Sequence, residues 1–126
     1  MKISLRDPPR RFDADGTGRL VLSDAGSIEL AADEQVTFVA PSGSEYDVVR
    51  KEWGYYATPS LNSRLPGRGL RPVLLRNRSG RFFVCLVESD RERRFADYLQ
   101  SANLHVLGWL DDAATLERIA SVLERE

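Results

Sequence analysis

Nucleophilic chemistry has few candidate side chains in this sequence, which contains one cysteine, Cys85, and one histidine, His105. A reactive thiol needs a neighbouring base or cation that stabilises the thiolate, so a Cys85–His105 dyad requires their two strands to be neighbours. Because Cys85 lies in the apolar run FFVCLV, we expect a small buried hydrophobic residue instead. The sequence has no glycine pattern of a nucleophile elbow, a phosphate-binding loop or a dinucleotide site, and we expect no cofactor.

Residues 13–24 place oxygen-bearing side chains at the spacing of a calcium-binding loop. The carboxylates at its first, third and twelfth positions belong to Asp13, Asp15 and Asp24. Calcium takes about six to eight such oxygens, usually between two helices. Pro8-Pro9 disfavours a helix before the loop, and the glycine at 26 breaks the chain after it. We therefore expect a glycine-rich turn that leads into a strand, and no metal site.

The basic side chains are concentrated in the middle of the sequence. The formal net charge is −1, but residues 1–49 carry −4, residues 50–87 carry +7 and residues 88–126 carry −4. The guanidinium of arginine presents a planar fork that suits phosphate or carboxylate. This basic strip either binds an anion or neutralises the acidic flanks across the folded surface. Its members are Arg64, Arg68, Arg71, Arg76, Arg78 and Arg81.

A long loop precedes the basic strip and supplies the other candidate ligand-binding side chains. Residues 52–69 read EWGYYATPSLNSRLPGRG, without a sustained helical or strand period. We expect an extended entry and then a loop with one helical turn near 60–64. Loops of this length inside a compact domain are often functional. Tyrosine, amide and guanidinium groups together suit a sugar, a nucleotide or an anionic peptide. Trp53 is expected in the core. The predicted ligand-binding residues are Tyr56, Asn62, Arg64, Arg68 and Arg71.

Arg71 is the most demanding of these side chains, because it is expected on an apolar strand face. The strand predicted at 70–77 alternates, so Arg71 shares a face with Val73 and Leu75. A guanidinium among apolar side chains is unfavourable unless a negative charge pairs with it. The surrounding sequence has no carboxylate, so the partner is either distant in the sequence or an anionic ligand. We place the site where the 52–69 loop meets this strand.

The elements that must position these residues begin with short strands. The first dozen residues contain Pro8-Pro9, and we expect a loose arm over 1–12 with a short strand at 3–5. Turn-forming residues separate the segments that follow, which favours antiparallel neighbours. The alternating segments that predict strands lie at 19–23, 27–31, 35–40 and 46–50.

The last third of the sequence predicts a β-β-α-β-α unit. A hairpin joins strands at 70–77 and 81–88, and the second, apolar on both faces, is expected to be central. Pro72 is expected to place the first strand at an edge, or to confine its pairing to one side. A helix follows the hairpin, long enough for a parallel crossover to a strand at 104–110 and a final helix.

Capping and apolar spacing define the two helices of this unit. Ser89 and Glu92 match a capping box at the start of the first helix, and Asp111 or Asp112 is expected to cap the second. The predicted inward face of the first helix comprises Phe95, Tyr98, Leu99 and Ala102. That of the second comprises Leu116, Ile119, Ala120 and Leu123.

Length and composition fit one domain of this kind. The 126 residues are 42% hydrophobic and 29% charged, which is typical of globular proteins. No apolar run reaches the roughly 18 residues of a membrane span, and the first residues lack an apolar signal segment. We expect a single α+β domain over 1–126, located in the cytoplasm and not in a membrane. Its sheet is mainly antiparallel, with two C-terminal helices on one face.

Residues 45–110 resemble a group of small uncharacterised bacterial proteins. The resemblance rests on EYDV at 45–48, KEWGYYATPSLNSRL at 51–65 and FFVCLVE at 82–88. Such proteins are encoded among genes for surface-polysaccharide biosynthesis. The group has no assigned activity, so the resemblance implies only a context, which is sugar-nucleotide or glycan assembly in the cytoplasm. It gives weight to Trp53, Gly54, Tyr56, Pro59, Asn62 and Arg64.

Three functions are consistent with these features. We expect a small accessory or binding protein for an anionic, sugar-bearing ligand, such as a phosphosugar or nucleotide sugar, or for a partner enzyme. An alternative is a small sugar-modifying transferase or isomerase that uses Tyr56 or His105 as acid–base. The third is a nucleic-acid binder through the basic strip, which the lack of overall positive charge makes unlikely.

Overall fold

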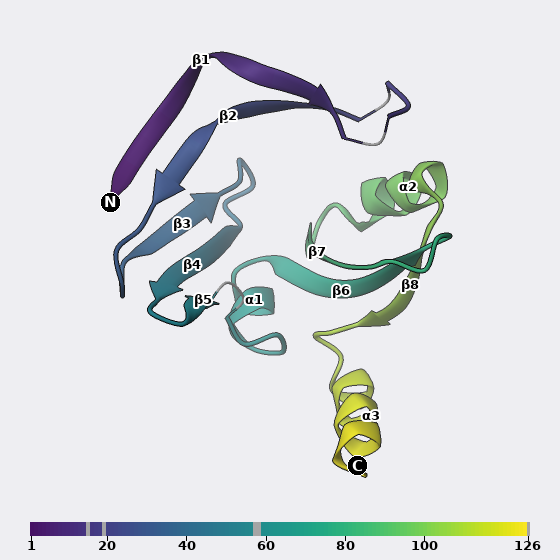
Figure 1. The fold of residues 1–126 in the computed structure, drawn as a ribbon. Helices are drawn as coiled ribbons and strands as arrows, with labels where there is room; N and C mark the ends of the chain where they lie inside the picture. The colour runs from purple at the N-terminus through teal and green to yellow at the C-terminus, as the bar shows by residue number, and fades with distance from the viewer. Residues whose placement is uncertain (15, 19, 57–58, 126) are drawn as a thin grey trace. The chain divides into compact units, whose positions relative to one another are not determined.

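The fold is of the α+β class, with strands and helices that follow the order expected in the last third of the chain (Figure 1). The computed structural model describes residues 1–14, 16–18, 20–56 and 59–125. The chain divides into two compact units, one of residues 1–35 and 49–55 and the other of residues 36–48 and 56–126.

The first unit contains a two-stranded antiparallel ribbon. β1 (Lys2–Asp13) pairs with β2 (Val21–Glu29), with an irregularity between Leu5 and Arg10. A strand thus occupies the segment where we expected a loose arm. β2 also runs through residues 24–26, where we expected a turn. β2 continues through these residues because Gly26 lets it lie close to β1: a Cβ at Gly26 would lie 2.2 Å from the Ser4 carbonyl oxygen. Glycine permits this approach at a bulge.

The second sheet has the strand order β3-β4-β5. β3 (Gln35–Val39) and β4 (Glu45–Lys51) confirm the strands expected at 35–40 and 46–50. A short strand, β5 (Gly54–Tyr56), forms inside the predicted loop. The loop also contains one helical turn, α1 (Arg64–Gly67), slightly later than the turn we expected near 60–64.

The third sheet belongs to the second unit and has the strand order β7-β6-β8. Its strands match the predicted positions: β6 (Leu70–Asn77), β7 (Phe82–Glu88) and β8 (Leu104–Trp109). β6 is antiparallel to both neighbours, so β7 and β8 run parallel to each other. The connection through α2 (Glu92–Ala102) is the expected parallel crossover, but it joins strands that β6 separates.

The central strand is β6, not the apolar β7 that we expected there. Apolar side chains on both faces are typical of a central strand, but Phe82 and Val84 of β7 are 58% and 56% exposed. Pro72 is compatible with the centre because its carbonyl oxygen accepts from Leu110 N at 2.8 Å, just beyond the end of β8. The nitrogen and carbonyl of a strand residue face the same neighbour. The side of Pro72 that lacks an N–H donor therefore faces the residue just after β8, where the β6–β8 pairing has already ended.

The core of the second unit lies between the third sheet and α2. Val73 and Leu75 of β6 are fully buried, and Val87 is nearly so. Phe95 and Leu99 of α2 pack against them, as the helical spacing predicts. The register places Val73, Leu75 and Val87 on one face, so α2 covers that face. The two other residues predicted for the inward face of α2, Tyr98 and Ala102, are exposed.

α2 begins without the capping box that the sequence predicts. Its N-cap is Arg91, and no side chain caps the helix. Glu92 instead accepts a hydrogen bond from Arg71 at 2.6 Å. A charge-assisted bond to a guanidinium is stronger than a bond to a backbone amide, which explains why this carboxylate is drawn away from the helix end.

The final helix is α3 (Ala113–Glu124), and its N-cap is Asp112, one of the two caps that the sequence predicts. The Asp112 carboxylate accepts from the backbone nitrogen and hydroxyl of Thr115 at 3.0 and 2.8 Å, and these bonds lower its pKa. The expected inward face is only partly covered, because Ile119 and Leu123 are exposed. Within the described part of the chain, no helix has the length and apolar character that a membrane crossing requires.

Candidate functional site

Arg71, predicted as a ligand-binding residue, is held by carboxylates of the acidic C-terminal flank. Its Nε and Nη2 donate to Asp111 at 2.7 and 3.1 Å, and its Nη1 donates to Glu92 at 2.6 Å. The guanidinium also lies 4.2 Å above the ring centre of Trp109. The hydrogen bonds to Asp111 and then to Glu92 raise the pKa of Arg71. The negative charge that this strand position requires therefore comes from residues distant in the sequence.

Arg64 pairs in the same way with the acidic N-terminal flank. Its Nε and Nη2 donate to Asp47 Oδ2 at 3.1 and 2.8 Å. The Thr37 hydroxyl donates to the other oxygen of Asp47 at 2.8 Å. The hydrogen bonds from Arg64 and then from Thr37 hold the pKa of the buried Asp47 carboxyl below its usual value. This geometry makes Arg64 a structural partner of β4.

The remaining predicted residues, Tyr56, Asn62 and Arg68, are all exposed. Arg68 donates to Glu45 through Nη1 at 2.7 Å, and its side chain is 48% exposed. For Tyr56 and Asn62, the described residues provide no side-chain hydrogen bond or ion pair. Trp53, which we expected in the core, is 72% exposed. The structure thus does not gather the five predicted residues into one cluster.

Arg68 lines a polar hollow in the second unit, with a volume of about 250 Å³. The hollow lies where the segment after α1 enters β6. Backbone hydrogen bonds from Glu45 N to Arg68 O at 3.2 Å and from Ser89 N to Gly69 O at 3.0 Å join its walls. The residues that line this polar hollow are Ser42, Gly43, Ser44, Arg68, Gly69, Ser89 and Asp90.

Glu88 organises the hydroxyl groups of the polar hollow. Its Oε1 accepts hydrogen bonds from the hydroxyls of Ser42 and Ser44, the latter at 3.2 Å. Gly69 allows the chain to pass close by, because it has a φ of +85° and a Cβ there would lie 3.3 Å from the Cβ of Ser44. The two serines that bind Glu88 therefore line the same hollow as Arg68.

An aromatic recess of about 350 Å³ adjoins the polar hollow at Ser44. Phe38 and Tyr46 stack with ring centres 6.2 Å apart, and both line the recess beside Glu88. These residues were not predicted as a site, because the segment between the strands expected at 35–40 and 46–50 has the composition of an ordinary turn. The available signal was the pair of serines around a glycine between two strands with aromatic side chains. The other residues of the recess are Val39, Ala40, Leu70 and Leu86.

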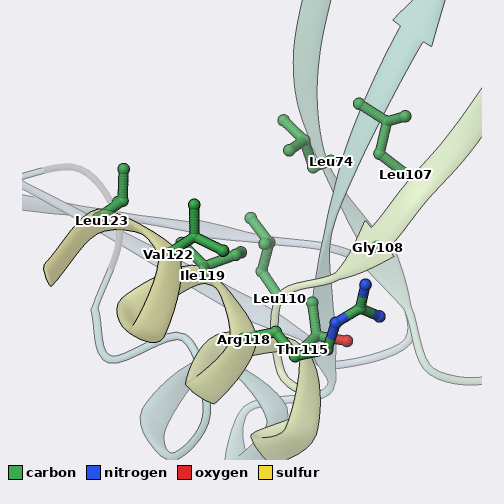
Figure 2. Close-up of a pocket in the computed structure, with 9 residues that line it drawn as sticks. All are labelled: Leu74, Leu107, Gly108, Leu110, Thr115, Arg118, Ile119, Val122 and Leu123. Atoms are coloured by element: carbon green, nitrogen blue, oxygen red, sulfur yellow. The ribbon is translucent and has the colours of Figure 1, made fainter. Parts of the chain in front are cut away.

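A third hollow, the α3 groove, has a volume of about 350 Å³ and an apolar lining (Figure 2). Figure 2 shows side chains of α3 on one side and side chains of the third sheet and the segment after it on the other. The α3 groove shares no lining residue with the polar hollow or the aromatic recess. It is lined by Leu74, Leu107, Gly108, Leu110, Thr115, Arg118, Ile119, Val122 and Leu123.

Cys85 and His105 do not form a dyad. Cys85 lies opposite Val73 and His105 lies opposite Arg76, so they are on different edge strands of the sheet and on opposite faces. Burial raises the pKa of the Cys85 thiol, which disfavours the reactive thiolate. Over the described ranges, no group of three or more metal-ligating side chains is present.

The calcium-like segment also lacks a gathered ligand set in its described part. Asp13 accepts hydrogen bonds from Gly16 N at 3.1 Å and Gly18 N at 2.6 Å, as in a glycine-rich turn. Asp24 pairs with Arg6 and Arg10 at 3.1 and 3.3 Å. Asp15, the third-position carboxylate, and Arg19 lie outside the described residues.

Comparison with known proteins identifies no relative of this chain. The chain matches no protein-family model, no curated protein and no solved structure. The site is therefore interpreted from its own residues.

Proposed function

We propose that this chain is a small accessory protein that binds a sugar-bearing ligand without a catalytic step of its own. The observation that carries the proposal is the junction of the polar hollow and the aromatic recess at Ser44. Glu88 lines the recess and binds the serine hydroxyls of the hollow. One ligand can therefore meet an aromatic surface and a set of polar groups at the same time.

A sugar presents both kinds of surface that this site accommodates. Its C–H face packs on aromatic rings, as Phe38 and Tyr46 provide here. Its hydroxyls donate to carboxylates and exchange hydrogen bonds with serine hydroxyls. Arg68 supplies a cation for a phosphate or carboxylate on the same ligand. Binding pockets of this kind combine apolar walls with a few placed polar groups.

Among the predicted arginines, Arg68 is the one that we assign to the ligand. Arg64 and Arg71 each use two or more guanidinium nitrogens on carboxylates of their own chain. Arg68 donates to Glu45 through a single nitrogen and borders the polar hollow. The anionic part of the ligand is therefore expected near Arg68. The resemblance of residues 45–110 implies that such a ligand belongs to cytoplasmic glycan assembly.

Two other functions remain as alternatives with less support. A sugar-modifying enzyme would need an acid–base residue beside the ligand, and neither Tyr56 nor His105 lines the polar hollow or the aromatic recess. A nucleic-acid binder would need unpaired cations along a surface. Three arginines of the basic strip pair with carboxylates instead.

The proposal is tested by ligand-detected NMR titration with glucose, N-acetylglucosamine 1-phosphate and UDP-N-acetylglucosamine. We expect the two phosphorylated sugars to bind, and Arg68→Gln and Glu88→Gln each to weaken binding by about tenfold, the effect of losing one charge-assisted hydrogen bond. Arg78→Gln, an exposed arginine of the basic strip outside the site, is the matched control.

Two results would contradict the proposal. One is binding that Arg68→Gln and Glu88→Gln leave unchanged, which would place the ligand elsewhere. The other is turnover of the nucleotide sugar that His105→Ala abolishes and Cys85→Ala does not, which would establish the enzyme instead. A loss of affinity for random DNA with rising salt would favour the nucleic-acid binder.

A further inference from the structure

The α3 groove is an apolar surface that the described residues leave open to solvent. Its sheet side includes Leu74 and Leu107, and its helix side includes Ile119 and Val122 (Figure 2). Leu107 is 45% exposed and Val122 is 58% exposed. Helical spacing predicts Ile119 on the inward face of α3, yet its side chain is 38% exposed because the described residues do not cover it. Exposed apolar patches that polar residues border are typical of binding surfaces.

The backbone of β8 is shaped to form this groove. Leu74 pairs with Gly108 and Leu75 pairs with Val106, so Leu107 is an extra residue in β8. Such a bulge turns one side chain away from the regular alternation, and Leu107 joins Leu74 in the groove. Gly108 lets α3 approach, because a Cβ there would lie 3.0 Å from Cγ2 of Thr115.

The charges on α3 are asymmetric about the groove. Arg118 lines it, and Arg125 follows seven residues later as the C-cap of α3. By the same spacing, Glu117 and Glu124 lie on the opposite side of α3. Neither arginine has an ion pair with another described residue. Arg118 therefore gives the groove a positive charge that no carboxylate in the described part of the chain pairs with, in contrast to Arg64, Arg68 and Arg71.

We propose that the α3 groove binds an acidic amphipathic helix of a partner protein. Apolar side chains three and four residues apart on that helix fill the groove, and a carboxylate beside them pairs with Arg118. This is the groove-binding mode of helical ligands, and complementary charge across the rim selects the partner. A volume of about 350 Å³ suits a few large side chains rather than a whole domain.

The charge pattern argues against a second copy of this chain as the occupant. An antiparallel pair of α3 helices, joined by a two-fold axis across the apolar face, brings the same flank of each helix together. That flank carries Arg118, the charged side chain that lines the groove, so like charges would face each other. An acidic helix of another protein has no such penalty.

The test uses the full chain and two synthetic peptides of about fourteen residues, long enough to form a helix on binding. Both carry leucines along one face. One has glutamates on the flanks and the other has lysines at the same places. We expect fluorescence anisotropy to show at least tenfold tighter binding of the glutamate peptide.

Variants at the rim and the floor of the groove separate charge from apolar contact. Arg118→Glu is expected to reverse the preference, so that the lysine peptide binds more tightly. Val122→Ser is expected to lower the affinity for the glutamate peptide by about tenfold, because the contact then lacks a buried aliphatic side chain. Arg93→Glu, the same charge change at an exposed position of α2, should leave the preference intact.

Three outcomes would overturn the inference. The first is equal affinity for the two peptides, and the second is no binding of either at millimolar concentration. The third is a dimer, detected by sedimentation, that Val122→Ser dissociates, because a second copy would then occupy the groove. These outcomes are independent of the proposed sugar site, since the two surfaces share no lining residue.

Discussion

Single arginine–carboxylate pairs join segments of this chain that are far apart in sequence. Arg71 reaches Asp111 and Glu92, and Arg64 reaches Asp47. In each case the carboxylate comes from one of the two acidic flanks. The Asp47 and Asp111 side chains are only 11% exposed, and removing one partner of such a pair leaves a poorly solvated charge. These arginines are therefore expected to matter for stability.

Arg71→Ala is predicted to lower the free energy of unfolding by about 2 kcal/mol, because it leaves Asp111 without its guanidinium partner. Urea unfolding followed by circular dichroism measures the change. The control is Arg78→Ala, at an exposed position without an ion pair among the described residues, where a change within about 0.5 kcal/mol is expected. Identical midpoints for the two variants would show that the Arg71 pairs contribute nothing.

The Asp47 carboxylate is predicted to make stability depend on pH in the acid range. Its pKa is lower in the folded state, because Arg64 and Thr37 donate to the charged form. The folded state therefore binds fewer protons, and the stabilisation is complete above the unfolded pKa of about 4 and is lost as pH falls below it. Urea midpoints at about pH 6 and pH 3.5 should differ less in Asp47→Asn than in the native chain.

The matched control for this pH dependence is Asp97→Asn, an exposed position of α2. That variant should keep the full difference between the two urea midpoints. An equal loss in both variants would mean that the acid sensitivity comes from general charge repulsion and not from the contacts of Asp47.

At the scale of elements, one glycine determines how closely α3 follows β8. Gly108→Ala would place a Cβ 3.0 Å from Cγ2 of Thr115, so the first turn of α3 must shift. We predict a loss of about 1 kcal/mol in the free energy of unfolding and faster hydrogen exchange in α3. Gly67→Ala is the control, because nothing lies within 4 Å of its Cβ position. Equal stability of the two variants would show that α3 adjusts freely.

At the scale of the whole molecule, exposure differs strongly between the two units. Every residue of β1 is exposed along the two-stranded ribbon, whereas β6 contains the fully buried Val73 and Leu75. Isolated two-stranded ribbons are marginally stable, and regions with few buried contacts open first. Native-state hydrogen exchange should therefore be at least about tenfold faster for β1 amides than for β6 amides. Equal protection would contradict this order.

Local patterns in the sequence were sufficient to predict most elements of the second unit. The spacing of apolar residues located β6, β7, α2, β8 and α3, because the strand and helix periods are properties of the chain itself. The N-cap of α3 was narrowed to Asp111 or Asp112, because an aspartate just before an apolar helical run can accept from the first free amides, and the structure shows Asp112. The ligand site that we expected at the junction of the 52–69 loop with the next strand stays a prediction, which the sugar titration tests.

Only the tertiary structure decided which strand is central and which charges meet. Strand order depends on long-range pairing, so the apolar β7 lies at an edge and β6 lies between its neighbours. The carboxylates of Arg64 and Arg71 are distant in sequence, and no local pattern identifies them. The polar hollow and the aromatic recess draw on several segments that converge at Ser44. Such a site exists only after the chain has folded, because it depends on which segments become neighbours.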